Sequence, residues 1–430
     1  TFYGAVGTAT QGGWAFLPIY LGPMLVILFA WSMISRIVAL SKRQNLTSIA
    51  DFLAARYGKA RSLAVLVTII AIVGSVPYIA LQLKAVATGV TIVSGGGDSA
   101  AASYDSALII AASLAVFAIL FGTRQIDASE HHHGMMLAIA FESVVKLLAF
   151  VAVGLFAFGL LGSSADSGGR TVADVFPLDR LPATFLTQTL LASAAIFCLP
   201  RQFHVAVVEA QEGADLRAAR WQFPLYLLVI CLFVVPITVA GLNVLPAGRF
   251  AGDTFVLALP MHGGQDWLTL LAYLGGFSAA TGMVIVASVT LATMVSNEIV
   301  MPLLLRLRSL ARGERSDFSR VLLLVRRAAI LGIAAMAYAY FRLIDSGAAL
   351  ASIGLLSFAA AAQFAPLIVL GMYWHGATRR GALAGLATGF ALWGYTLFLP
   401  GLARSGAIPG SFVTDGLFGQ AWLRPEALLF

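Results

Sequence analysis

The chain has 430 residues, 60% of them hydrophobic and only 11% charged, with a formal net charge of +7. Soluble domains carry about 25% charged residues, and apolar runs long enough to cross a bilayer recur along this chain. A soluble enzyme and a nucleic-acid-binding domain are therefore excluded. Cys198 and Cys231 lie in apolar segments without a partner pattern, which argues against disulfides and against a zinc site.

The apolar runs predict an all-α, polytopic membrane protein with about 11 membrane helices in this chain. A short fragment at 1–7 comes first. The spans that follow are 14–40, 64–93, 104–122, 134–162, 184–199, 218–245, 267–300, 318–341, 347–373 and 380–400.

The loops between these spans differ in charge. Most of the 27 Lys and Arg residues lie in alternate loops, namely 36–62, 122–133, 201–220, 306–327 and 375–381. The positive-inside rule places these loops in the cytoplasm. The excess positive charge therefore orients the protein in the bilayer, and no nucleic-acid partner is expected.

Three adjacent histidines, 131–133, lie beside Asp127 and Glu130 in one of these loops. Adjacent side chains of a helix cannot all point at one ion, and nothing else in the sequence completes a site. We interpret this loop as a solvated interfacial segment and expect no metal.

An acid and a base occur inside the predicted span 134–162. Glu142 precedes Lys146 by four residues, so the two side chains can meet on one helical face. Counted from Gly134 at the cytoplasmic start, Glu142 lies roughly 12 Å along the helix at 1.5 Å per residue. Neither charge reaches the surface without snorkelling. Either the pair neutralises itself so that the helix can insert, or Lys146 partly takes the place of a cation and Glu142 is a protonation site.

The segment AAIFCLPRQFHVAVVEA, 194–210, predicts a broken membrane helix. Pro200 removes a backbone donor and clashes with the preceding turn. Freed backbone groups in a membrane must face protein or a water-filled cavity. Broken helices of this kind bind solute in many secondary transporters, but a proline kink is also common in membrane helices without any binding role.

Two stretches resemble the sodium/solute symporter family. QFAPLIVLGMYWHGATRRGALAGLATG, 363–389, is similar to the tenth core helix and the loop after it. RQFHVAVVEAQEGADLRAAR, 201–220, is similar to the sixth core helix and the basic loop that follows it. The resemblance covers essentially the whole chain.

This resemblance implies a LeuT-like fold of inverted five-helix repeats and a secondary active transporter that works by alternating access. The chain would then be one transmembrane domain, 1–430, cut at both ends. Its first repeat would be 1–162, its second 184–373, and 380–400 would be an extra helix.

Four further segments resemble the transporter-like N-terminal domain of CbrA-type sensor histidine kinases. The segments are TFYGAVGTATQGGWAFLPIYLGP, VPYIALQLKAVATGV, RQIDASEHHHGMMLAIAFESVVKLLAF and MVSNEIVMPLLLR. This resemblance implies histidine as the solute and a multi-pass location in the bacterial inner membrane. It also implies a cytoplasmic kinase module beyond Phe430, with its response regulator as partner. The alternative function is thus a ligand-sensing domain in which transport is secondary or absent. No catalytic site and no cofactor are expected within these residues.

The family resemblance also bears on the coupling ion, which is either sodium or a proton. In the family, the Asp of a Thr-Asp-x-x-Gln motif follows a Gly by eight residues. Here Gly134 plus eight gives Glu142, so the acid is retained as Glu. The family's second sodium site uses an Ala-x-x-Ser-Ser/Thr motif that would begin at Ala279. Its hydroxyl positions then fall on Gly282 and Met283.

A shifted register offers only Thr281, with Ser278 one turn away. Because sodium needs several oxygen ligands, we expect proton coupling or loose coupling rather than strict sodium symport.

The candidate solute-binding residues are polar or aromatic side chains in membrane spans. Gln363 matches a position that contacts solute in sugar-transporting relatives, although a buried Gln needs partners in any case. Gln82 lies in the third core helix, whereas Lys84 next to it is interpreted as snorkelling. The other candidates lie near the break and are Phe197, Gln202 and Phe203. For each of them, packing is the alternative explanation. His204, beside them, is as well explained by a structural role.

Overall fold

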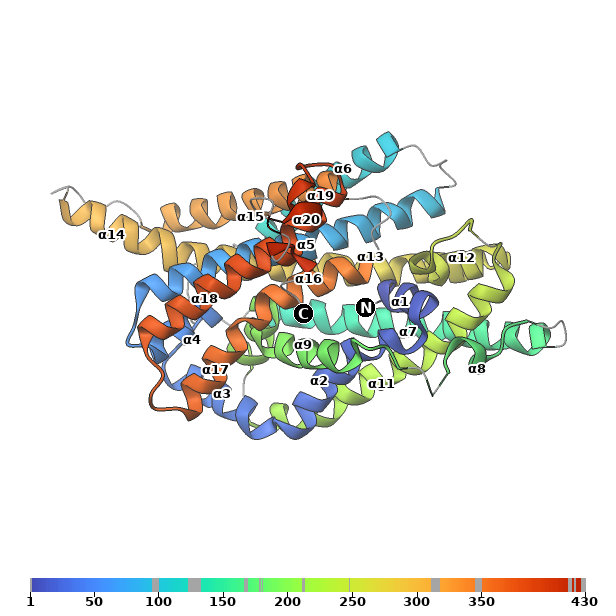
Figure 1. Ribbon diagram of the computed structural model, residues 1–430, viewed down its shortest axis with the longest axis horizontal. Coiled ribbons are helices and arrows are strands. Elements are labelled where there is room, and N and C mark those ends of the chain that lie inside the picture. The colour runs from blue at the N-terminus through green and yellow to red at the C-terminus, as the bar shows by residue number, and fades with distance from the viewer. Residues whose placement is uncertain are drawn as a thin grey trace.

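The computed structural model describes residues 2–94, 100–122, 133–165, 169–177, 179, 181–210, 213–246, 248–310, 318–344, 350–416, 420 and 423–426. Within these residues the secondary structure is helical and no strand occurs. The histidine-containing loop, including Asp127 and Glu130, lies outside the described residues apart from the first turn of the helix that begins at His133. The long helices run roughly along one axis of the molecule (Figure 1).

The first part of the chain forms α1 to α7. The elements are α1 (Gly4–Gly12), a 3₁₀ turn (Gly13–Phe16), α2 (Pro18–Phe29), α3 (Trp31–Arg43), α4 (Ile49–Arg56), α5 (Arg61–Val93), α6 (Ala100–Gly122) and α7 (His133–Ala165).

The remainder forms α8 to α20. The elements are α8 (Val172–Val175), α9 (Phe185–Cys198), α10 (Pro200–Phe203), a π-helical turn (His204–Val208), α11 (Gly213–Val244), a 3₁₀ turn (Gly252–Thr254), α12 (Phe255–His262), α13 (Asp266–Met294), a π-helical turn (Val295–Val300), α14 (Met301–Leu310), α15 (Phe318–Leu343), α16 (Leu350–Ala362), α17 (Phe364–Tyr373), α18 (Arg379–Trp393), a π-helical turn (Gly394–Phe398), α19 (Leu399–Arg404) and α20 (Ser411–Asp415).

The described helices confirm a polytopic membrane protein. Seven of them are long and apolar enough to cross a membrane, and two bent helix pairs and the shorter apolar helix Ser106–Leu120 add to these. Every span that hydropathy predicts has a helical counterpart. The arrangement as inverted repeats stays a prediction.

The predicted span 14–40 is wrong as a single helix. The chain bends by 60° between Gly4–Phe16 and Pro18–Phe29, and it breaks again at Ala30. Gly13 adopts φ +53°, which a residue with a side chain rarely takes, and an added Cβ would overlap the Val175 carbonyl. Pro18 then starts α2 at a position where its missing N–H is harmless.

The predicted break after α9 is confirmed. α9 and the segment Pro200–Val208 are bent by 54°. Leu199 is extended, with φ −64° and ψ 127°, as expected for a residue before proline. Pro200 occupies the first position of α10. A helix has therefore ended and restarted inside the apolar span.

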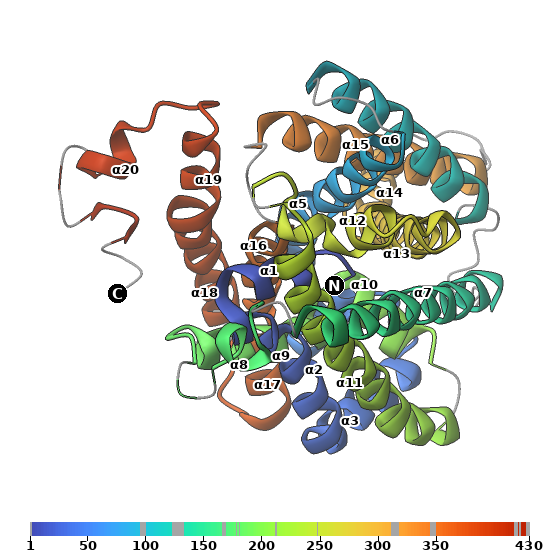
Figure 2. The ribbon, with the colours of Figure 1, turned by 90° about the vertical axis from the view of Figure 1, so that its right-hand side faces the viewer.

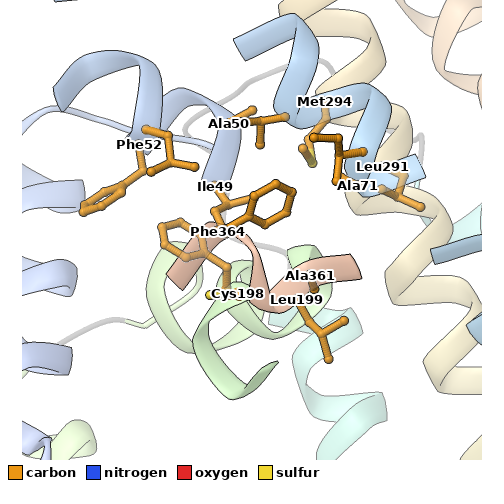
Figure 3. Packing of buried hydrophobic residues seen from close by; sticks show 14 of the residues in the cluster. Ile49, Ala50, Phe52, Ala71, Cys198, Leu199, Leu291, Met294, Ala361 and Phe364 are labelled. Carbon is orange, nitrogen blue, oxygen red and sulfur yellow. The ribbon is translucent and has the colours of Figure 1, made fainter. Parts of the chain in front are cut away.

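Apolar packing surrounds this break. Figure 3 shows Cys198 and Leu199 from the end of α9 together with Phe364 of α17 and Ile49 of α4. Phe52 of α4 packs against Phe203, with ring centroids 5.6 Å apart. A second cluster of buried residues, with Phe2, Tyr20 and Phe150 among its members, lies on α1, α2, α7 and α11.

The two ends of the bundle are held by different loops. At one end the Arg56 side chain donates to the carbonyls of Gly371 and Trp374, and Arg379 bonds to Ser62 at 2.9 Å. At the other end Asn243 donates to the Arg170 carbonyl at 3.0 Å. Figure 1 shows α3, α4 and α17 at one end and α8 and α12 at the other. Loops that charge assigns to one side of the membrane therefore meet at one end.

Figure 2 views the bundle down its long axis. α1 lies near its centre, whereas α18 and α19 run along one edge, with α20 beyond them. α1 packs against α11 and α16, and α13 packs against α5 and α7. Of these helices, α1, α5, α7, α13 and α16 line the candidate site.

Candidate functional site

A cavity of about 100 Å³ lies between α1, α2, α5, α7, α10, α13 and α16. Its wall is mostly aromatic and aliphatic, and a few polar groups reach it. The polar lining residues are Tyr3, Tyr20, Tyr78, Gln82, Lys146 and Arg201. A small, largely apolar cavity with a few convergent polar groups is the usual form of a small-molecule site.

Arg201 reaches this cavity from the second position of α10. Its side chain is only 8% exposed, and the guanidinium carbon lies 4.0 Å from the centre of the Tyr78 ring. One terminal nitrogen donates to the sulfur of Met283, which is a weak acceptor, and Nε has no hydrogen-bond partner. The break in α9–α10 thus brings a cation to the middle of the bundle.

Glu142 and Lys146 both lie on the inner face of α7. Glu142 is 7% exposed and Lys146 6% exposed. The Glu142 carboxylate lies within electrostatic range of both Lys146 and Arg201. The Lys146 ammonium also lies 5.8 Å from the centre of the Tyr226 ring. The three charges form one cluster, and α7 and α10 contribute them from distant parts of the sequence.

Glycine at position 282 makes room for Glu142. A Cβ added to Gly282 of α13 would overlap the Glu142 carboxylate. The carboxylate therefore lies against α13 where the symporter resemblance expects a hydroxyl side chain. Lys146 lines the adjoining cavity, together with Ala279 and Met283 of α13.

The residues at the positions of the symporter motif on α13 do not offer the ligands that would bind a sodium ion there. Gly282 has no side chain, and Met283 offers only a sulfur, whereas hard cations bind several oxygens. The Thr281 hydroxyl donates to the Phe277 carbonyl of its own helix. Ser278, the remaining hydroxyl of the prediction, is outside the described lining of the cavity.

The structure divides the predicted solute-binding residues into two groups. Gln82 lines the cavity. Phe203 is fully buried in the apolar packing around the break, and Phe197 packs against the same cluster. Gln363 has its Oε1 beside Gly389 of α18, and this oxygen has no hydrogen-bond partner. Gln202 forms the second group with Phe197, Phe203 and Gln363, since none of the four is in the described lining of the cavity.

His204 has a structural partner. Its Nε2 lies 3.2 Å from Oε1 of Glu209, and both residues are buried at the π-helical turn that follows α10. No cluster of three or more metal-ligating side chains occurs among the described residues.

Sequence reasoning did not select Arg201 or Tyr78 as site residues. Arg201 appears in the sequence only as part of the break. A cation directly after a proline in an apolar span was nevertheless a usable signal, because charges at this depth usually face a bundle interior or a water-filled cavity. Tyr78 offered no such signal, since its role depends on the contact of its ring with Arg201, a residue far away in the sequence.

A second cavity of about 200 Å³ adjoins the first and shares Tyr3, Ala85 and Leu350 with it. It lies toward the end of the bundle that the charge of the loops predicts to face outward, and is called the outer cavity. Asp253 lines this outer cavity and accepts a hydrogen bond of 3.0 Å from the backbone N–H of Leu350, the first residue of α16. A Cβ at Gly7 of α1 would overlap the Asp253 carboxylate. Asp253 therefore joins the loop before α12 to α1 and α16.

The environment of Asp253 makes its carboxyl a weaker acid than usual. Burial raises the pKa of the Asp253 carboxyl above its ordinary value of 3.8, against the hydrogen bond from Leu350 and the charge of Lys84, which lower it.

Comparison with known proteins finds similarity to symporters. No protein-family model matches this sequence. A Bacillus subtilis protein named uncharacterized symporter YhjB is 25% identical over 406 residues, which are 90% of this chain and 76% of that protein. A solved structure of a Na⁺-coupled sialic acid symporter, in a substrate-bound outward-open state, matches 100% of this chain and 86% of its own with a TM-score of 0.66 at 14% identity. This chain is therefore a multi-pass membrane protein that shares the helical fold of a solved symporter.

Proposed function

We propose that this chain is the membrane domain of a secondary active transporter, which moves a small solute across a bacterial inner membrane by cation-coupled alternating access. The central cavity beside the α9–α10 break carries the proposal, because it is buried, polar at a few points and formed by both bent helix pairs. The similarity to symporters in sequence and in fold supports it.

The proposed coupling ion is a proton carried by Glu142. The related solved symporter is Na⁺-coupled, which makes sodium the competing choice. The contacts of Gly282 and Met283 favour the proton, because an acid and two cations occupy the region where hydroxyl ligands are expected. Lys146 then partly takes the place of a cation, and Glu142 gains and loses the proton.

The proposed solute is an amino acid such as histidine, as the resemblance to CbrA-type proteins implies. The same resemblance supports the alternative function, a ligand-sensing domain joined to a cytoplasmic histidine kinase. The transporter and the ligand-sensing domain predict different results: a transporter must accumulate solute, whereas a sensing domain needs only to bind it.

Uptake of labelled histidine by proteoliposomes that contain the full-length protein tests these proposals. We expect an inward proton gradient to drive accumulation, and replacing sodium by choline to change the rate less than about twofold. Glu142→Gln should abolish gradient-driven accumulation but retain solute exchange, because exchange needs no net movement of the coupling ion.

Glu298→Gln is the matched control. Glu298 is another partly buried acid, located in the π-helical turn after α13 and away from the cavity. This variant should accumulate solute as the wild type does. Strict dependence on sodium would contradict proton coupling, and binding without uptake under any gradient would favour the sensor.

A further inference from the structure

We propose that the central cavity binds the carboxylate group of its solute between Arg201 and Lys146, so that the solute is a small organic molecule that must carry a carboxylate. This inference rests on the proposed function, because it names the chemical class that the same cavity accepts. It applies equally to a transported and to a sensed solute.

The first argument is that the guanidinium of Arg201 is only partly hydrogen-bonded. A guanidinium has five N–H donors, and a buried cation is costly unless it is paired and hydrogen-bonded. Here the Tyr78 ring covers one face, and the Met283 sulfur is a weak acceptor for one donor. Nε is buried and lacks a partner. An acceptor from inside the cavity would complete the site.

The second argument is the balance of charge. Lys146 and Arg201 both line the cavity, and the described lining includes no acidic side chain. Glu142 lies beside the two cations and, in its ionised form, offsets one of them. One positive charge therefore remains at the cavity wall, which suits a single negative charge on the solute.

The third argument is the shape and polarity of the remaining wall. Phe2, Leu81 and Phe358 offer an apolar surface for an organic body. The volume of about 100 Å³ is far below the roughly 300–1,000 Å³ of sites for drug-sized ligands. A planar guanidinium holds a planar carboxylate through two parallel hydrogen bonds, and an ammonium beside it adds a point charge.

The test is a thermal-shift binding assay on the full-length purified protein with pairs of compounds that differ in one group. The pairs are propionate and propionamide, and histidine and histamine, with sodium chloride at equal ionic strength as the third arm. We expect the carboxylate of at least one pair to raise the melting temperature of the wild type, whereas its partner and chloride do not.

The variants separate Arg201 from a general loss of structure. Arg201→Lys keeps the charge but loses the two-pronged geometry, and we expect it to weaken carboxylate binding about tenfold or more. Arg201→Gln and Lys146→Gln should weaken it further. Arg326→Gln is the matched control, because Arg326 of α15 is also buried, at 6% exposed, but is outside the described lining of the cavity.

Four results would overturn the inference: equal binding of the amide or amine partner, stabilisation by chloride alone, no stabilisation by any carboxylate tested, or unchanged affinity in Arg201→Lys. Failure of the carboxylate site and failure of the proposed transport can be told apart by comparing the binding assay with the uptake assay. Carboxylate binding without uptake would contradict transport alone, whereas uptake that Arg201→Lys leaves unchanged would contradict the carboxylate site alone.

Discussion

At the scale of single residues, the absence of a side chain at Gly282 decides where the Glu142 carboxylate can lie. The carboxylate of Glu142 occupies space that any side chain at position 282 would fill. Two neighbouring cations stabilise this buried acid, whereas an isolated charge in the same place would cost several kcal/mol. A glycine in the middle of a membrane helix thus allows a close approach of the Glu142 carboxylate in its present position.

Gly282→Ala should therefore displace the Glu142 carboxylate. Overpacking a filled site costs about 1–3 kcal/mol, so we expect a lower melting temperature and a loss of gradient-driven uptake. Thermal unfolding in detergent and proteoliposome uptake measure the two effects.

Gly332→Ala on α15 is the control for this substitution. Nothing lies within 4 Å of a Cβ at this position, so Ala should be neutral or should stabilise the helix by about 0.5–1 kcal/mol. If Gly282→Ala, like Gly332→Ala, lowers neither the melting temperature nor gradient-driven uptake, the close approach of Glu142 to Gly282 matters for neither stability nor transport.

At the scale of helices, one contact joins three elements beside the outer cavity, and the form of the protein that holds this contact is here called the closed form. Asp253 precedes α12, bonds the first N–H of α16 and lies against Gly7 of α1. The N-terminus of a helix favours a carboxylate, since its first N–H groups lack intrahelical partners. Movement of α12 away from α16 would open the outer cavity and return Asp253 to water.

The pH dependence of this closure follows from linkage. The closed form holds the pKa of Asp253 above its ordinary value of 3.8, so the closed form binds a proton more readily than an open form in which the carboxyl is hydrated. Acidification from neutral pH should therefore favour closure, with no further gain below the ordinary pKa.

A cysteine at Thr88, which lines the outer cavity, reports this closure through its reaction with an impermeant thiol reagent. Its labelling should slow as the pH falls, relative to an exposed cysteine at Gln265 that corrects for thiol ionisation. Asp253→Asn keeps an acceptor oxygen without the charge, so labelling should be slow and independent of pH. Relative labelling that speeds up on acidification would contradict this account.

At the scale of the whole molecule, the distribution of charge sets the orientation in the membrane. Two of the basic loops, 36–62 and 375–381, meet at the end of the bundle where Arg56 and Arg379 bond across to neighbouring segments. The positive-inside rule places this end in the cytoplasm. The opposite end, with Gln265 and the loop before α12, then faces outward.

Single exposed cysteines test this orientation. Gln265→Cys should react with an impermeant thiol reagent in right-side-out vesicles, whereas His375→Cys should react only in inverted or permeabilised vesicles. Native Cys198 and Cys231 are buried, at 0% and 7% exposed, and should contribute little background. The reverse pattern would show that the charge bias does not set the topology.

The sequence by itself determined the membrane class, the approximate spans, the break at Pro200 and the loops that share an end. These features depend on hydropathy, on the missing N–H of proline and on net charge, all of which act along the chain. It also placed Glu142 and Lys146 at a depth from which neither charge reaches the membrane surface without snorkelling.

Only the tertiary structure decided which side chains meet. Arg201 on Tyr78, Glu142 against Gly282 and Asp253 at the start of α16 each join residues far apart in the sequence. Hydrophobicity fixes that a helix is buried, but not which helix covers it or at what rotation. The same limit explains why Phe203 packs in the core around the break while Arg201, two residues earlier on the same short helix, lines the cavity.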